Sequence, residues 1–268
     1  MGVVNESQAV RRPGDGERPR SYKTEALVLR SRAMREADRL ITVLTPTIGK
    51  LPVTVRGARR INSRLAGHLD VFNHVHLTLA LGHRIDVVTG AESIESFGPL
   101  KANLGGVATG LYLMELADAL LPEAAPHSGA YELLLSAMRV LNTGKFFDVT
   151  ARYVELRLLE DSGYMPELNN CQVCGQAIEV GRHRYAPTLG GVIDASCQVP
   201  GGRVIPLSID ALKVLRHYHR STLADAAKIA LGRDLGTELE HILGVSLHYI
   251  LEREMGSADF VEHLRKIR

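Results

Sequence analysis

The three cysteines of the 268-residue chain fall in one Gly-rich, polar segment where they could bind a metal ion. Cys171 and Cys174 form a C-x2-C pair, and after nineteen intervening residues the matching position reads Asp194-x2-Cys197. Two thiolates at this spacing can hold one tetrahedral ion, and a carboxylate can supply a further ligand. The spacing predicts a Zn²⁺ site formed by Cys171, Cys174, Asp194 and Cys197, with His183 as the rival fourth ligand.

Other cysteine chemistry has less support from the sequence. A redox-active C-x2-C pair would be expected beside a βαβ pattern, and none surrounds this pair. A nucleophilic cysteine paired with His183 would need a third group to orient the base and an oxyanion hole, and the neighbourhood offers neither. Three cysteines in a chain of this size do not make a disulfide framework, which favours a reducing, cytoplasmic setting.

Phosphate binding is the second chemistry that the residues support. From Tyr22 to Arg64 there are ten Lys and Arg against three acidic residues, a local net charge of +7, although the whole chain carries only +2. Clustered cations displace counterions from a nucleic-acid backbone, and a guanidinium can hold two phosphate oxygens. The expected DNA-binding residues are Lys23, Arg30, Arg35, Arg39, Lys50, Arg56, Arg59, Arg60 and Arg64.

The alternative for this stretch is a solvated basic face without a ligand. Intramolecular pairing is most plausible for Arg35 and Arg39, because Glu36 and Asp38 lie between them in the sequence. The loop that carries Arg59, Arg60 and Arg64 has no adjacent acid. We therefore rank these three arginines first among the DNA contacts.

Five short strands must position most of these cations. The segments 24–30, 38–45, 50–57, 71–81 and 85–95 are rich in Val, Ile, Leu and Thr and are separated by turn-forming residues. In the fourth segment Val75, Leu77 and Leu79 alternate with His74, His76 and Thr78, which places the two sets on opposite faces of the strand. Five antiparallel strands in about 75 residues favour a five-stranded oligonucleotide-binding (OB) fold β-barrel, with an SH3-like barrel as the competitor.

Helical patterns dominate the rest of the chain. Helices are expected over residues 103–121, over a stripe containing Tyr131, Leu134, Leu135, Met138 and Leu141, over 152–161 and 208–219, along a stripe from Leu239 to Ile250, and over 259–267. The cysteine segment interrupts them. The fold class is therefore multi-domain α+β: a flexible leader (1–20), an OB-fold nucleic-acid-binding domain (21–97) and an all-α domain (98–268) with a small zinc-ribbon-like C-x2-C insert (169–202).

Several function classes find no support in the sequence. The chain has no run of about 18 uncharged apolar residues that could span a membrane, and no secretory signal follows Arg11 and Arg12. No G-x-x-x-x-G-K-[ST] loop for nucleotide binding is present. Because the carboxylates form no defensible catalytic constellation, we expect a binding protein. A zinc-ribbon transcription or scaffold protein that binds nucleic acid statically is the alternative, and a metal-dependent hydrolase ranks last.

The order of these features resembles that of the bacterial RecO family of DNA repair and recombination mediators. The similarity rests on YKTEALVLRSRAMREADRLITVLT, on GKLPVTVRGARRINSRLAGHLDVF, on YVELRLLEDSGYMPELNNCQVCG and on TLGGVI before the last cysteine. It runs from about Tyr22 to the C-terminal helix. Zinc-bearing members have a cysteine at the position of Asp194.

The resemblance implies a mediator without a turnover site. Such a protein binds single- and double-stranded DNA, anneals complementary strands and, with RecR in the RecF pathway, helps load RecA onto DNA coated with single-stranded DNA-binding protein (SSB). The implied partners are DNA, RecR, the acidic C-terminal tail of SSB and, indirectly, RecA, with no membrane. The implied location is the bacterial cytoplasm, at the nucleoid.

Overall fold

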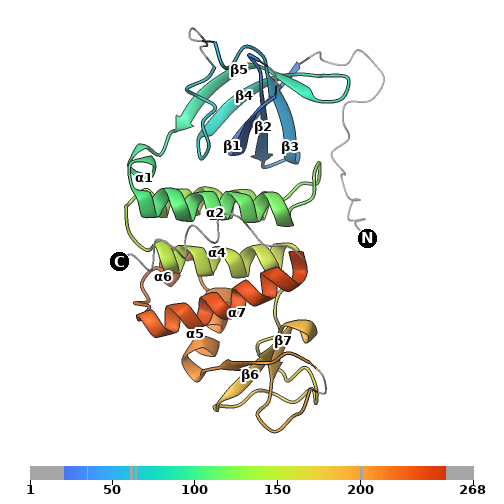
Figure 1. Ribbon diagram of the computed structural model, residues 1–268, viewed down its shortest axis with the longest axis vertical. Coiled ribbons are helices and arrows are strands. Elements are labelled where there is room, and N and C mark those ends of the chain that lie inside the picture. The colour runs from blue at the N-terminus through green and yellow to red at the C-terminus, as the bar shows by residue number, and fades with distance from the viewer. Residues whose placement is uncertain (1–20, 35, 61–62, 64, 200–201, 252–268) are drawn as a thin grey trace, which may run out of the picture. The chain divides into compact units, whose positions relative to one another are not determined.

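The computed structural model describes residues 21–34, 36–60, 63, 65–199 and 202–251, and the chain divides into two compact units (Figure 1). The barrel unit contains the described residues up to Ser96 together with Pro122–Tyr131. The helical unit contains Phe97–Leu121 and the chain from Glu132 onward. The predicted leader and the predicted helix over 259–267 lie outside the described residues.

The barrel unit is a closed five-stranded barrel in the order β1-β2-β3-β5-β4. All neighbouring strands are antiparallel except β3 and β5, which are parallel. The irregular pairing of β1 between Val28 and Arg30 lets its first half pair with β4 and its second half with β2. This order is consistent with an OB fold. The strands are β1 Ser21–Ala33, β2 Arg39–Thr45, β3 Gly49–Val55, β4 His74–Ala80 and β5 Asp86–Glu95.

The barrel core follows the predicted alternation. Val75, Leu77 and Leu79 are buried inside the barrel, whereas His76 is exposed. His74 does not belong to the barrel core, yet it is only 4% exposed. It is buried because a chain segment distant in sequence covers it.

The covering segment is Pro122–Tyr131, which packs with the barrel although the chain has already left it. The Ala124 amide donates to the carbonyl of Lys50 (2.8 Å), and the Tyr131 hydroxyl lies 2.8 Å from Nε2 of His74. Gly49 has φ +84, and a Cβ there would lie 1.7 Å from the carbonyl oxygen of Ala125. Only glycine therefore fits at this crossing.

The helical unit is built around one almost completely buried helix, α4, which packs against α2, α5, α6 and α7. Its burial includes the side chains of Arg152 and Glu155, which form an ion pair at 2.8 Å. The helix begins at Phe147, five residues before the predicted start. The described helices are α1 Gly98–Lys101, α2 Leu104–Leu120, α3 Ser128–Leu141 (which begins in the covering segment), α4 Phe147–Asp161, α5 Ile209–Arg220, α6 Leu223–Ala226 and α7 Arg233–Leu251.

Side-chain caps mark the starts of α2 and α5, at the positions where the predicted helices begin. The Asn103 side chain accepts the Gly106 amide before α2, and the Ser208 hydroxyl accepts the Ala211 amide before α5. Within the described residues, no helix has both the length and the apolar character needed to cross a membrane.

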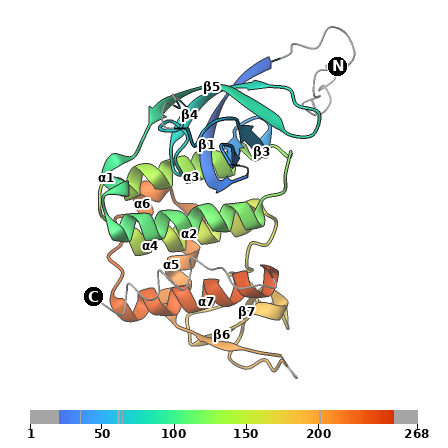
Figure 2. The ribbon, with the colours of Figure 1, turned by 45° about the horizontal axis from the view of Figure 1, so that its top comes forward.

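A three-stranded antiparallel sheet, in the order β7-β6-β8, corrects the prediction that the C-terminal domain is all-α. It carries the cysteine segment, packs beside α7 (Figure 2) and continues past the predicted end of the insert at residue 202. Strands of three or four residues are too short to show an alternating pattern, which is why the sequence did not reveal them. The elements are β6 His183–Ala186, the 3-10 helix η1 Pro187–Leu189, β7 Gly191–Ile193 and β8 Ile205–Leu207.

Candidate nucleic-acid interface and thiol cluster

Two loops at one end of the barrel carry several of the predicted DNA-binding arginines. In the strand register Ala33 pairs with Arg39 and Arg39 pairs with Val55, so β1 ends, β2 begins and β3 ends at the same level. The described loop residues 34, 36–38 and 57–60 leave from this level. We call this part of the barrel, with residues 32–34, 36–39 and 55–60, the basic end.

Hydrogen bonds hold the two loops of the basic end together. The Arg59 amide donates to the carbonyl of Ala37 (3.0 Å), and the Gly57 amide donates to Oδ1 of Asp38 (2.9 Å). Gly57 has φ +64, a conformation that glycine adopts at little cost. Asp38, which could neutralise its neighbour Arg39, thus also serves to join the loops.

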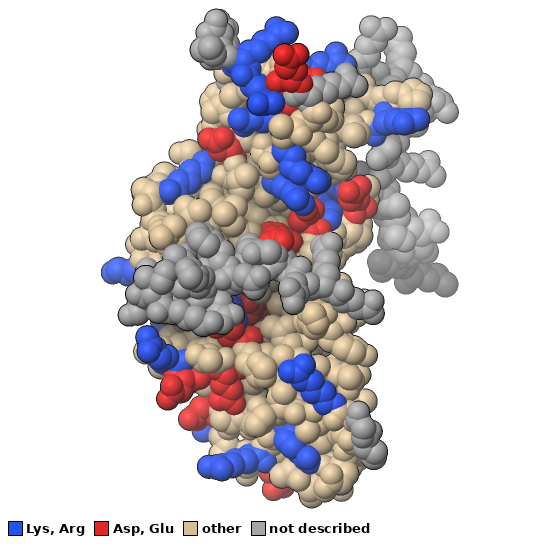
Figure 3. Space-filling view, in the orientation of Figure 1, with Lys and Arg blue, Asp and Glu red and all other residues tan. Residues whose placement is uncertain are grey.

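The predicted cations are in different environments. Lys23 and Arg30 are exposed on β1, Arg56, Arg59 and Arg60 are exposed at the basic end, and Arg39 is half-buried there. Lys50 differs from the expectation: it is only 6% exposed, in the part of β3 that the covering segment contacts. Arg35 and Arg64 lie outside the described residues. Figure 3 shows Lys and Arg side chains grouped over the barrel, with acidic side chains among them.

One exposed cation of the basic end was left out of the predicted set. Arg32 pairs in register with Leu40, next to Arg39, and its side chain is exposed. The alternation of Arg30 and Arg32 on the same face of a strand was the available signal.

The structure brings the three thiols together. The sulfur atoms of Cys171, Cys174 and Cys197 all lie within 4.8 Å of one another. The Cys171 sulfur accepts hydrogen bonds from the amides of Val173 (3.4 Å) and Asp194 (3.3 Å), the arrangement that supports a metal-bound thiolate. Cys171 is buried, Cys197 is half-buried and Cys174 is exposed. This donor set suits a thiophilic ion such as Zn²⁺.

The pKa values of Cys171 and Cys197 are also consistent with a bound cation at the thiol cluster. Burial raises the pKa of Cys171, but the backbone amides and the neighbouring Cys174 lower it, with a net value of about 7. Interaction with the Cys174 side chain, burial and repulsion from Cys171 raise the pKa of Cys197 to about 11. Cys171 and Cys197 therefore ionise together only with difficulty unless a positive ion offsets their repulsion.

The two candidate fourth ligands are not part of this cluster within the described chain. The Asp194 carboxylate accepts hydrogen bonds from the backbone and hydroxyl of Ser196, and these bonds lower its pKa. His183 is buried, and its Nε2 lies 2.9 Å from the carbonyl of Glu179. The structure thus groups the three predicted cysteines and leaves Asp194 beside them.

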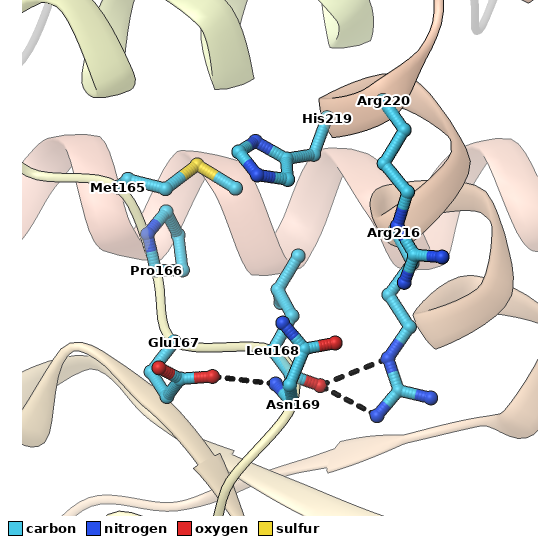
Figure 4. Close-up of a pocket in the computed structure, with 8 residues that line it drawn as sticks. All are labelled: Met165, Pro166, Glu167, Leu168, Asn169, Arg216, His219 and Arg220. Atoms are coloured by element: carbon cyan, nitrogen blue, oxygen red, sulfur yellow. Dashed lines mark hydrogen bonds between the residues drawn. The ribbon is translucent and has the colours of Figure 1, made fainter.

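A pocket of about 300 Å³ in the helical unit was not foreseen (Figure 4). Met165, Pro166 and Leu168 supply apolar surface, and three basic side chains of α5 line the other side. The Arg216 guanidinium donates to the carbonyl of Leu168 at 3.0 and 2.7 Å. The basic lining residues are Arg216, His219 and Arg220, and the remaining ones are Glu167 and Asn169.

Comparisons with known proteins agree with this architecture. Residues 20–97 match the family model "Recombination protein O N terminal", and residues 102–259 match "Recombination protein O C terminal". The "DNA repair protein RecO" of Roseiflexus sp. (strain RS-1) is 36% identical over 250 residues, which cover 93% of this chain and 88% of that protein. Proteins with the same name from Dehalococcoides mccartyi (strain ATCC BAA-2266 / KCTC 15142 / 195) and Desulforudis audaxviator (strain MP104C) are 33% and 36% identical, covering 88% and 91% of this chain and 93% and 98% of theirs. The chain belongs to the RecO family.

Proposed function

We propose that this chain is a DNA repair and recombination mediator that binds single- and double-stranded DNA and anneals complementary strands. With RecR it assists RecA loading onto SSB-coated single strands, and it has no catalytic site of its own in this proposal. Its proposed location is the bacterial cytoplasm, at the nucleoid. The observation that carries the proposal is the basic end, where Arg32, Arg56, Arg59 and Arg60 are exposed on strands and loops that end together. The barrel (21–97) is the proposed DNA-binding domain, and residues 98–268 form the proposed partner-binding domain.

Phosphate contacts made from paired loops suit an annealing protein. They carry no base information, so the protein can hold strands of any sequence. Neutralising two backbones at one surface lowers their mutual repulsion, so complementary strands can test their register without a covalent step or a nucleotide cofactor. Lys23 and Arg30, exposed on β1, extend this surface beyond the basic end.

The test is fluorescence anisotropy of a labelled single strand across a salt series. The variant Arg59→Ala/Arg60→Ala should bind more weakly, with a slope of log affinity against log salt that is shallower by about 1.4, or about 0.7 per lost contact. Arg203→Ala/Arg233→Ala is the matched control, because both residues are exposed in the helical unit. An unchanged slope in the first variant, or an equal change in the control, would place the DNA elsewhere.

Annealing itself separates a mediator from a static binder. Pairing of two complementary labelled strands should accelerate in the presence of the wild type and lose most of this acceleration in Arg59→Ala/Arg60→Ala. A protein that binds both strands but leaves the pairing rate unchanged would instead be the transcription or scaffold protein considered above.

The pocket beside α5 is the proposed docking site for the SSB tail. An acidic peptide with a hydrophobic end requires an apolar groove lined by cations, and the pocket combines Met165, Pro166 and Leu168 with basic side chains. Arg220→Glu should weaken binding of a labelled tail peptide at least about fivefold, or about 1 kcal/mol. Lys213→Glu, an exposed change on the same helix, should not. Equal peptide affinity in the two variants would contradict this placement.

The thiol cluster is proposed to hold one structural Zn²⁺ ion. Cys171, Cys174 and Cys197 supply the thiolates, and the ion would tie the loop of the first two cysteines to that of the third. Chelation should therefore lower the melting temperature of the helical unit. Cys197→Ser should remove both the ion and this response to chelator.

A further inference from the structure

The environment of Asp194 bears on whether its side chain supplies the fourth ligand of the metal site. Residue 194 takes part in the cluster through its main chain, since its amide donates to the Cys171 sulfur at 3.3 Å. That hydrogen bond does not depend on the side chain. The loop can therefore keep its shape around Cys171 whether residue 194 is a cysteine or an aspartate.

The carboxylate of Asp194 is already engaged elsewhere. Its Oδ1 accepts both the Ser196 amide (2.9 Å) and the Ser196 hydroxyl (2.6 Å), a local turn typical of aspartate. Its Oδ2 lies 3.6 Å from Nδ1 of His183. To bind the metal, the carboxylate would have to give up these interactions.

His183 is no better placed as a ligand. Its Nε2 is held by the carbonyl of Glu179 at 2.9 Å, and its Nδ1 faces Asp194. The Glu179 contact holds the ring at Nε2, whereas the buried Nδ1 forms no hydrogen bond with any described residue. Neither candidate contributes a ligand atom to the group of three sulfurs within the described chain.

Hydrogen bonds from Arg184 hold the Cys197 loop in place, so the loop does not need a fourth metal ligand to fix its shape. Its guanidinium donates to the carbonyls of Asp194, Ala195 and Cys197, so this loop is braced by protein contacts alone. Three thiolates and a dication leave one excess negative charge, and the single positive charge of Arg184 lies beside the same loop. The exposure of Cys174 and the partial exposure of Cys197 give small solutes access to the cluster.

We propose that Cys171, Cys174 and Cys197 form a three-thiolate metal site whose fourth coordination position is open to water and exchangeable for a small thiol, while Asp194 shapes the loop without binding the ion. The inference rests on the zinc proposal above and is independent of DNA binding. Structural zinc sites are usually closed by four protein ligands, so an open position predicts a more exchangeable ion. Arg184 and the Asp194–Ser196 turn are positioning groups.

Cobalt substitution of the full chain, kept reduced and free of oxygen, tests the fourth ligand. The sulfur-to-cobalt charge-transfer band grows with the number of bound thiolates, and the visible bands report the ligand geometry. Wild type and Asp194→Asn should give the same spectra and take up Zn²⁺ with affinities within about threefold, because asparagine can still accept from Ser196. Added mercaptoethanol should raise the charge-transfer band of both by about one third, as three thiolates become four.

Asp194→Cys is the complementary variant. Its charge-transfer band should already be about one third stronger than that of the wild type, and mercaptoethanol should not change it. Asp70→Asn, an exposed acid of the barrel unit, is the matched control and should behave as the wild type. Circular dichroism of each apo protein checks that the variants are folded.

Two results would overturn the inference while leaving the zinc proposal intact. One is a loss of tenfold or more in metal affinity in Asp194→Asn with altered visible bands, which would make Asp194 a ligand. The other is a wild-type spectrum that does not respond to mercaptoethanol, which would mean that the protein closes the site. Failure of the wild type to take up any Zn²⁺ or Co²⁺ would overturn the zinc proposal as well.

Discussion

Removal of one partner from the buried ion pair of α4 should lower the free energy of unfolding strongly. Arg152 and Glu155 are 3% and 0% exposed, and their side chains meet at 2.8 Å. The Tyr112 hydroxyl donates to the same carboxylate oxygen at 2.5 Å. Arg152→Met leaves that carboxylate buried without the cation beside it, and truncations of this kind cost about 3–5 kcal/mol.

Urea unfolding followed by far-ultraviolet circular dichroism measures this cost, because the helices lie in the unit that contains the pair. With a denaturant dependence of about 2 kcal/mol per molar urea, the midpoint should fall by about 1.5–2.5 M. Lys213→Met is the control, since Lys213 and Asp210 form an exposed pair with the same i, i+3 spacing. Its effect should stay below about 0.5 kcal/mol.

A double variant tests the physical explanation. Arg152→Met/Glu155→Leu removes both charges and should recover most of the lost stability, although the Tyr112 hydroxyl loses its acceptor at a cost of about 1–3 kcal/mol. Adding Tyr112→Phe should restore that part. The reasoning is refuted if Arg152→Met unfolds within about 1 kcal/mol of the wild type, or if the double variant is less stable than the single one.

Three smaller changes probe other parts of the two units. Tyr131→Phe removes the hydroxyl 2.8 Å from Nε2 of His74 and should destabilise the barrel by about 1–2 kcal/mol, seen as faster hydrogen exchange in β4. Gly57→Ala places alanine at φ +64 and should cost about 1 kcal/mol in urea unfolding. Tyr218→Phe should leave stability at pH 7 unchanged or raise it by about 1 kcal/mol, because none of the described residues pairs with the buried hydroxyl. Burial, opposed by Arg152, raises the pKa of Tyr218 to about 12. Ionisation of Tyr218 should therefore cost the wild type about 2–3 kcal/mol between about pH 10 and pH 12, and the alkaline melting curves of Tyr218→Phe should lack this contribution.

Matched substitutions at unconstrained positions serve as controls for these three. Tyr164→Phe and Tyr249→Phe change exposed tyrosines and should have no effect beyond about 0.5 kcal/mol. Gly67→Ala lies where an added methyl group meets nothing and φ is not positive, so it should be tolerated. Effects in a control equal to those of its test variant would mean that the proposed contact is not responsible.

The regular elements could be predicted from the sequence because their signals are local. Alternation of apolar residues located β4, and Asn103 and Ser208 defined the starts of α2 and α5 through their side-chain caps. The proximity of Cys171 and Cys174 followed from their spacing, because a C-x2-C turn brings two sulfurs to one place whatever the rest of the fold does. Cys197 joins them from a loop 23 positions after Cys174, so its place depends on the fold. Hydrophobic alternation, capping residues and C-x2-C spacing each determine structure within a few residues of the chain.

The environments of Lys50 and His74 could not be predicted in the same way. Each of the two residues lies on the face of its strand that points away from the barrel core. Both are nevertheless buried by contacts with residues 122–131, which lie more than 45 positions later in the sequence. No local pattern encodes such a contact. A sequence can therefore indicate that a stretch is basic without indicating which of its cations remain accessible to DNA.

The surroundings of Asp194 show what residue spacing alone leaves undetermined. The spacing treats aspartate as a substitute for cysteine, but an aspartate followed two residues later by serine also favours a local turn in which the carboxylate accepts the backbone amide. The structure has that turn, with the Ser196 hydroxyl as a second donor. A thiol at the same position would form much weaker hydrogen bonds to Ser196 and would be available to the metal. Under the proposal of an open fourth position, aspartate at residue 194 therefore keeps the loop that presents Cys197 and supplies no side chain to close the site.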